Sequence, residues 1–135
     1  MTAAVCAACC AAHAQDAGLA AALACPHAAE VTQQHLLGMW RAEFESLPQG
    51  ATLLLERHGE QDENLHGAIN RNGERAELAG DVDDGEFNLE ESADGISIDA
   101  TWTGEVVEGS CGREIRGTWR ARGNPQSRGF VLRKQ

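Results

Sequence analysis

The sequence predicts an all-β fold, an eight-stranded antiparallel up-and-down β-barrel with a short N-terminal helical segment. After Leu37, short segments alternate apolar and polar side chains, which is the two-residue period of strands with one buried face. The breaks between these segments contain Gly, Asn, Asp or Pro, the residues of tight turns. The connections are too short for crossover helices, so the strands must be antiparallel.

Residues 15–35 are expected to form a tether that leads into a short helix, and residues 36–135 to form the barrel domain. The stretch AAEVTQQHLL contains good helix formers, and Gly38 follows as a residue that commonly ends helices. The expected strands, in order, are Leu37–Phe44, Ala51–His58, Leu65–Arg71, Arg75–Val82, Glu86–Glu91, Ile96–Thr103, Arg113–Ala121 and Gly129–Arg133.

Three connections are expected to be two-residue hairpin turns, at Asn72-Gly73, Asp84-Gly85 and Asp94-Gly95. Asn-Gly and Asp-Gly tolerate the positive φ angles that a type I′ turn requires. The stretch NLEESADGISIDATW is therefore expected to be two adjacent antiparallel strands that fold back at Asp94-Gly95.

One face of every expected strand is apolar. The side chains expected to point inward are Trp40, Ala42, Leu53, Leu55, Leu65, Ile69, Ala76, Leu78, Val82, Phe87, Leu89, Ile96, Ile98, Ala100, Trp102, Ile115, Trp119, Phe130 and Leu132. Gly38, Gly67, Gly80 and Gly117 share this face within their strands. Glycine allows a sheet to bend sharply, which favours a closed barrel over a sandwich. This face contains no polar cluster, so none is expected inside the barrel.

The formal charge of −10 gives no net attraction to nucleic-acid phosphates or anionic lipids, so nucleic-acid binding is not expected. The charge is uneven, because residues 113–135 carry seven basic side chains and one acidic side chain. This segment is either a solvated basic surface or a binding surface for an anionic ligand or partner, and the sequence leaves both interpretations open.

The N-terminal region predicts a periplasmic or secreted protein. Residues 1–14 are interpreted as a signal segment, because a short apolar run ends in Ala-His-Ala, a pattern that signal peptidases recognise, although the segment lacks Lys and Arg. Without that segment, Cys25 and Cys111 remain as an even pair. A disulfide between them is predicted, and two separate thiols are the alternative. No run reaches the roughly 18–20 apolar residues of a membrane span.

The segment Gly38-Met39-Trp40, at the start of the first expected strand, resembles the Gly-x-Trp opening of the lipocalin and avidin group of calycin-type small β-barrels. The resemblance covers these three residues and the eight-strand meander. It implies a closed barrel with a ligand mouth. It also implies a late-strand cation that packs across Trp40, and the candidates for this cation are Arg120, Arg122 and Arg133.

The expected function is binding rather than catalysis. No serine lies in a G-x-S-x-G context, and the adjacent Glu90 and Glu91 point to opposite faces of one strand. No catalytic residue, metal site or cofactor is assigned. Because the inward side chains are expected to fill the interior, a protein partner such as an exported hydrolase is favoured. The alternative is a small hydrophobic or anionic ligand at the barrel mouth. The residues assigned to that ligand are Trp40, Trp102, Trp119 and Arg120.

Overall fold

The structure of the protein is a computed structural model that describes Thr2, residues 25–57 and residues 64–135. The signal segment predicted over residues 1–14 lies, apart from Thr2, outside the described residues. A 3-10 turn, η1 (Ala28–Glu30), and a short helix, α2 (Gln33–Leu36), precede the first strand. The predicted helical segment before the barrel is therefore confirmed.

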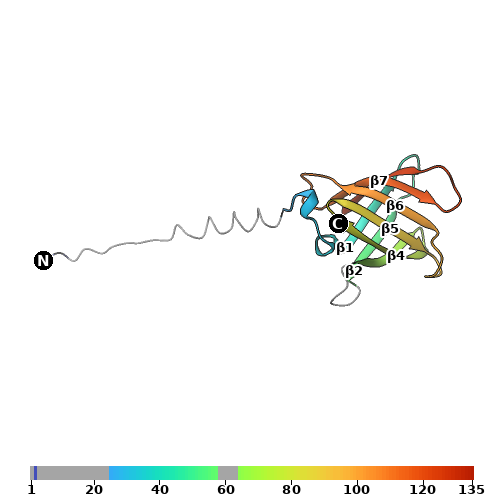
Figure 1. Cartoon of the computed structure of the whole chain (residues 1–135), viewed down its shortest axis with the longest axis horizontal. Coiled ribbons are helices and arrows are strands. Elements are labelled where there is room, and N and C mark those ends of the chain that lie inside the picture. The colour runs from blue at the N-terminus through green and yellow to red at the C-terminus, as the bar shows by residue number, and fades with distance from the viewer. Residues whose placement is uncertain (1, 3–24, 58–63) are drawn as a thin grey trace.

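Eight antiparallel strands close into one barrel in sequence order (Figure 1). The strands are β1 (Gly38–Phe44), β2 (Ala51–Arg57), β3 (Leu65–Arg71), β4 (Glu74–Asp83), β5 (Glu86–Ser92), β6 (Ala100–Val106), β7 (Glu114–Ala121) and β8 (Arg128–Lys134). The ring closes because β1 pairs with β8 as well as with β2, with Trp40 opposite Lys134 and Phe44 opposite Phe130. The predicted fold class, an up-and-down barrel, is confirmed.

Two of the three predicted hairpin turns are confirmed. Asn72 and Gly73 have φ angles of 54° and 91°, and Asp84 and Gly85 have φ angles of 51° and 78°. Two consecutive positive φ angles are what a type I′ turn requires. These turns join β4 to its two neighbours, β3 and β5, over ladders of seven residue pairs each.

The third connection differs from the prediction. β5 ends at Ser92 and β6 begins at Ala100, so residues 93–99 form a loop rather than a two-residue turn. The predicted inward positions of Ile96 and Ile98 are wrong, because these residues are 89% and 42% exposed. The two strands are nevertheless adjacent and antiparallel, as the alternating pattern predicted.

The reason for this difference is the side chain of Asp94, which closes the loop from within. Its carboxylate accepts hydrogen bonds from the backbone N–H groups of Ile96 and Ser97, both at 2.8 Å, and from the Ser92 hydroxyl at 3.0 Å. These bonds lower the pKa of Asp94, and the bond from Ser97 has the largest effect. Such bonds compete with the strand ladder for the same backbone N–H groups, so the next strand starts later.

The interior of the barrel is tightly packed. Among the residues that the structure describes, those with no exposed surface are Leu36, Trp40, Ala42, Leu53, Leu65, Phe87, Trp102, Ile115 and Leu132. A water-sized void beside these side chains would leave part of their surface accessible, so none adjoins them. Gly67 and Gly117 face inward, and a Cβ at either position would overlap a backbone carbonyl oxygen of the neighbouring strand. Glycine therefore permits the close approach that the closed ring needs.

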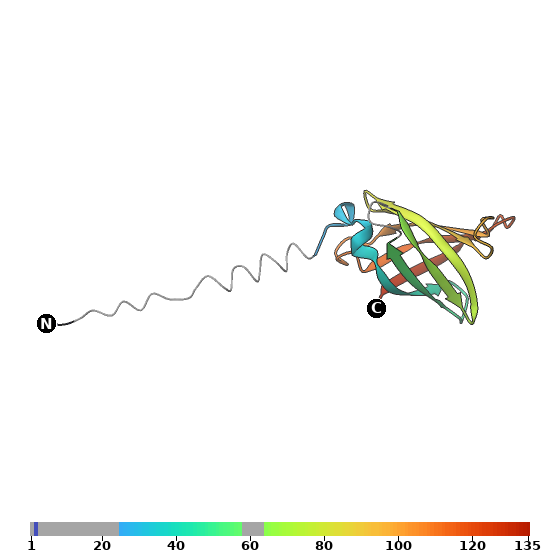
Figure 2. The same ribbon diagram turned by 90° about the horizontal axis from the view of Figure 1, so that it is seen from below.

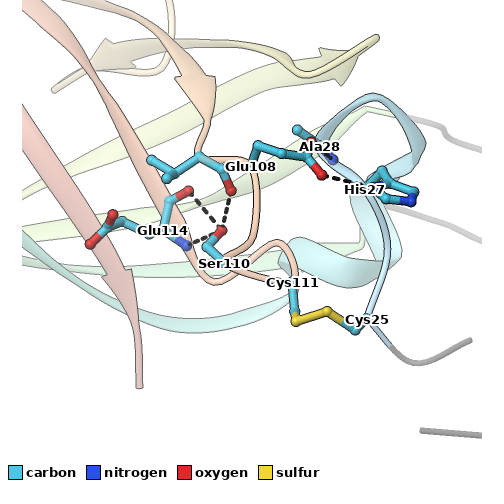
Figure 3. Close-up of a disulfide and its surroundings, with 8 residues drawn as sticks. Cys25, His27, Ala28, Glu108, Ser110, Cys111 and Glu114 are labelled. Carbon is cyan, nitrogen blue, oxygen red and sulfur yellow. Dashed lines mark hydrogen bonds and ion pairs between the residues drawn. A yellow bond between two sulfur atoms is a disulfide. The ribbon is translucent and has the colours of Figure 1, made fainter. Parts of the chain in front are cut away.

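The two ends of the barrel differ (Figures 1 and 2). The closed end carries η1, α2, the 84–85 turn, residues 107–113 and the C-terminus. Val31 and Leu36 are buried there, and the predicted disulfide between Cys25 and Cys111 is confirmed (Figure 3). The open end carries the connections 45–50, 72–73, 93–99 and 122–127. Within the described ranges, no helix has the length and apolar character needed to cross a bilayer.

Candidate functional site at the open end

A buried carboxylate lies inside the open end of the barrel. Glu91, on β5, is only 3% exposed, whereas its neighbour Glu90 is exposed on the outer face. The inward face was predicted to contain no polar cluster, and this prediction is wrong. Every second residue of β5 points inward, so Phe87 and Leu89 are followed by Glu91 on the same face.

Glu91 is surrounded by hydrogen-bond donors. Its Oε1 accepts the indole N–H groups of Trp102 at 2.7 Å and Trp119 at 2.9 Å. Arg71, the last residue of β3, donates from one terminal nitrogen to Oε1 at 2.9 Å and from the other to Oε2 at 3.3 Å. The carboxylate is therefore fully partnered, which is the condition for burying an ionised group without a large desolvation cost.

The guanidinium of Arg71 also lies beside two aromatic rings, Phe44 and Trp119, whose centroids are 5.9 Å apart. Its central carbon is 5.8 Å from the ring centroid of Phe44 and 5.5 Å from that of Trp119, both within cation–π range. The Phe44 ring also packs against Trp102, with centroids 5.3 Å apart. We call these five residues, Phe44, Arg71, Glu91, Trp102 and Trp119, the mouth cluster.

The mouth cluster fills the barrel at its open end, so this end gives no access to the interior. Trp102 is completely buried and Phe44 is 7% exposed, whereas the Arg71 side chain is 34% exposed and Trp119 is half-buried. The outer boundary of the cluster therefore consists of the Arg71 guanidinium and part of Trp119. A ligand reaching the barrel from this end meets that surface rather than an open cavity.

The sequence contained a signal for this cluster. On β3 the inward residues Leu65, Gly67 and Ile69 are followed at the same parity by Arg71. On β7 the inward period of Ile115 also reaches Trp119. Trp119 was already predicted to point inward, and extending the apolar faces of β3 and β5 by one more position would have placed Arg71 and Glu91 at the same end of the barrel.

The residues assigned to ligand binding lie in different places. Trp102 and Trp119 lie together in the mouth cluster. Trp40 is at the closed end, where its indole N–H donates to the carbonyl of Leu36 at 2.7 Å. Arg120 lies outside the barrel, and its Nε donates to the carbonyl of Asn124 at 2.8 Å. The structure therefore does not bring the four residues into one site.

The cation beside Trp40 is not one of the three arginines that the resemblance implied. Lys134, on β8, is the residue opposite Trp40, and its Nζ donates to the carbonyl of His35 at 2.7 Å. Burial lowers the pKa of Lys134, and the nearby Arg113 lowers it further. Arg133 instead points outward and forms an ion pair with Glu43 at 3.1 Å.

A second feature of the open end is a hollow of about 550 Å³ on its rim. Ile96, Ile98, Arg120 and Arg122 line it, together with small side chains of β6 and β7. We call these four residues the rim hollow. Its lining contains two exposed isoleucines and two arginines and no carboxylate. An exposed apolar surface with flanking arginines is typical of protein contact surfaces.

The basic segment 113–135 does not form one continuous basic surface. Arg116 and Arg133 both form ion pairs with Glu114, at 3.3 Å and 3.2 Å. Arg120 and Arg122, by contrast, form no ion pair with any residue in the described part of the chain. Arg128, at the start of β8, also forms no ion pair with a described residue. Two of the three unpaired arginines of this segment at the open end, Arg120 and Arg122, therefore line the rim hollow.

The closed end is held by side chains from distant parts of the chain (Figure 3). The carboxylate of Glu108 contacts the ring Nδ1 of His27 at 2.7 Å and accepts the backbone N–H of Ala28 at 2.9 Å. The hydrogen bond to Glu108 and the negative charge of Glu108 raise the pKa of His27. The hydrogen bonds from His27 and from the backbone N–H of Ala28 lower the pKa of Glu108. With the disulfide beside it, this contact fixes the N-terminal segment to residues 107–113.

Among the residues that the structure describes, no three His, Cys, Asp or Glu side chains are grouped so that they could hold a metal ion. The chain matches no protein-family model, and it has no significant match among curated proteins. The eight-stranded antiparallel barrel fits a calycin-like fold, and the geometry of the open end is the basis for a functional interpretation.

Proposed function

We propose that the protein is a non-enzymatic binding protein that recognises a protein partner, such as an exported hydrolase, through the open end of the barrel. The observation that carries this proposal is the closed interior: Trp40 and Trp102 have no exposed surface, and the mouth cluster covers the end. Binding energy must then come from the outside of the barrel. The rim hollow offers apolar surface there, in Ile96 and Ile98.

The loop that presents the two isoleucines supports this proposal. Asp94 fixes the 93–99 loop with its three hydrogen bonds, and Asp99 accepts the backbone N–H of Ala93 at 2.7 Å. The loop is also tied to its neighbours, because the Arg122 N–H donates to the carbonyl of Asp99 at 2.8 Å. A loop that is ordered before binding loses less conformational entropy in a complex than a flexible loop would.

Export is part of the proposal. The disulfide between Cys25 and Cys111 is compatible with an oxidising compartment, where such bonds persist. The predicted signal segment, residues 1–14, supports the same location, and fractionation of cells that produce the full chain tests it. Recovery of the oxidised chain in the cytosol alone would contradict export without affecting the argument for the rim hollow.

The test of the function is a capture experiment with three forms of the full-length chain, using extract from the cell compartment where the protein is found. The wild type should retain a protein that the double variant Ile96→Asp/Ile98→Asp does not retain. Ala79→Asp, on the exposed outer face of β4, is the control for adding a charge elsewhere. A retained protein that binds all three forms equally would contradict recognition through the rim hollow.

A second candidate function is lipocalin- or avidin-like capture of a small ligand at the mouth. The half-buried Trp119 ring and the Arg71 guanidinium are the observation in its favour, since a flat ligand could stack on the one and bond to the other. Extraction of the purified chain followed by mass spectrometry tests it. A stoichiometric small molecule that is lost in Trp119→Ala would support this function over protein recognition.

A further inference from the structure

The outer wall of β1 to β4 carries a groove of about 670 Å³ that is separate from the rim hollow. The strand registers show how its floor is built. Arg41 lies opposite Thr52, Thr52 lies opposite Asn70, and Asn70 lies opposite Arg75. These four residues line the groove and form one transverse row across four strands, with an arginine at each end.

A second, apolar row lies directly beside the first. This second row is two residues away from the first on each strand. In it, Met39 lies opposite Leu54, and Leu54 lies opposite Ala68. All three line the groove, and Met39 is 45% exposed. The groove therefore has an apolar strip along one side and a hydrogen-bonding row with terminal cations along the other. This row of apolar residues ends at Glu77 on β4, opposite Ala68.

The charge in this groove is of one sign. No carboxylate lines it, although the chain has 21 acidic and only 11 basic side chains. Neither Arg41 nor Arg75 forms an ion pair with a residue that the structure describes. The Arg41 guanidinium lies beside Gly50, where an added Cβ would be 3.1 Å from it. Two arginines on an acidic protein thus remain available to an external anion.

We propose that this groove, the two rows named above, binds an acidic amphipathic helix of a protein partner. Three strand spacings separate Arg41 from Arg75, or about 14 Å. A helix rises 1.5 Å per residue, so carboxylates roughly 7 to 11 residues apart can reach both arginines from one helix. Apolar side chains between them, at three- and four-residue spacing, face the strip of Met39, Leu54 and Ala68.

The surrounding charges favour an acidic helix in this groove over other positions. The outer faces of β4 and β5 carry Glu77, Asp81, Glu86 and Glu90, which repel an acidic segment. Electrostatic repulsion on one side and two free arginines on the other restrict where the helix can bind. This inference is independent of the proposed recognition through the rim hollow, because the two surfaces share no lining residue.

The test uses the full-length chain, labelled with ¹⁵N, and two synthetic amphipathic helical peptides of about 15 residues. Both peptides have leucine at three- and four-residue spacing; one carries glutamate on its polar flanks and the other lysine at the same positions. The glutamate peptide should shift the amide resonances of Leu54 and Asn70 saturably, with an affinity roughly tenfold or more above that of the lysine peptide. Equal affinities, or no saturable shift, would overturn the proposal.

Two variants of equal net charge locate the site. Arg41→Glu/Arg75→Glu should lower the affinity for the glutamate peptide by roughly tenfold or more. Arg120→Glu/Arg122→Glu, in the rim hollow, should leave this affinity unchanged. All four arginines have outward side chains, and thermal unfolding of each variant verifies that it is folded. If both variants weaken binding equally, the attraction is only long-range charge and the groove is not the site.

A small anionic amphiphile is the competing occupant, and decanoate below its micellar concentration is the probe for it. If decanoate shifts the same amides and displaces the glutamate peptide at lower concentration, the groove is a small-molecule site and the helix proposal is wrong. These outcomes differ from those of the capture experiment with Ile96→Asp/Ile98→Asp, so failure of either proposal leaves the other testable.

Discussion

Removal of the buried carboxylate should destabilise the barrel, although Glu91 lies near one end of it. In Glu91→Ala, the indole N–H of Trp102 loses its acceptor, and Trp102 is completely buried. A buried donor without a partner costs about 1–3 kcal/mol. Trp119 and Arg71 can reach water, because one is half-buried and the side chain of the other is 34% exposed, so their losses are smaller.

These contributions sum to a loss of about 3 kcal/mol in the free energy of unfolding for Glu91→Ala. Glu91→Gln keeps an acceptor for Trp102 but loses the charge and one of the two oxygens to which Arg71 donates, so we expect a loss of about 1–2 kcal/mol. Glu90→Ala, on the exposed face of the same strand, is the matched control and should change stability by less than about 0.5 kcal/mol. From most to least stable, the expected order of the variants is therefore Glu90→Ala, Glu91→Gln and Glu91→Ala.

Urea unfolding followed by tryptophan fluorescence measures these differences, with a constant slope as evidence that each variant unfolds in the same way. Arg71→Ala should be at least as costly as Glu91→Ala, because it leaves a buried charge without its ion-pair partner. The double variant Arg71→Ala/Glu91→Ala should cost less than the sum of the single variants. If Glu91→Ala is as stable as Glu90→Ala, the hydrogen bonds to Trp102 and Trp119 are absent in solution and the mouth is not closed as described.

Three further predictions concern the closed end of the barrel and the close approach of two strands at Gly117. Cys25→Ser/Cys111→Ser opens a loop of 86 residues, so by the chain-entropy estimate unfolding should become easier by up to about 4.5 kcal/mol, and an unchanged urea midpoint would contradict this. The contact of His27 with Glu108 should be strongest between the ordinary pKa values of 4.5 and 6.5. It weakens as pH rises through the raised pKa of His27, and as pH falls through the lowered pKa of Glu108. The protection of the Ala28 amide against hydrogen exchange should be greatest in this pH range. In His27→Gln, the loss of protection at high pH should disappear. Gly117→Ala places a Cβ on the Thr103 carbonyl oxygen, so its melting temperature should fall by several degrees, whereas a melting temperature equal to that of the wild type would refute the close approach.

Much of the fold could be predicted because the two-residue period is a local property. The positive φ angles at Asn72-Gly73 and Asp84-Gly85 follow from the residue types, and they fix both ladders of β4. The same reasoning failed at Asp94, because a side chain there accepts the N–H groups that the next strand would have used. Asp-Gly is compatible with both outcomes, and only the surrounding hydrogen bonds decide between them.

The mouth cluster was missed for a different reason. Arg71 and Glu91 have the inward parity of their strands, but a search for apolar faces stops at the first charged residue. Each of these charges can be buried only because the other is there, together with Trp102 and Trp119. That mutual dependence joins β3, β5, β6 and β7, and it depends on strand neighbours that no single segment reveals.

The outer groove lies further beyond sequence reasoning, because it depends on register. The row from Arg41 to Arg75 exists only when β1, β2, β3 and β4 are aligned residue by residue. The turn at Asn72-Gly73 fixes one of these three alignments. The other two follow longer connections, whose length does not determine the register.

The central claim is that the barrel is closed and filled, so that binding takes place on its outer surface. Hydrogen exchange of the three indole N–H groups in the wild-type chain, followed by NMR, tests it most directly. We expect Trp40 and Trp102, which are completely buried, to exchange at least roughly a hundredfold more slowly than the half-buried Trp119. If Trp40 or Trp102 exchanges as fast as Trp119, water reaches the interior, and the case for recognition on the outside of the barrel is contradicted.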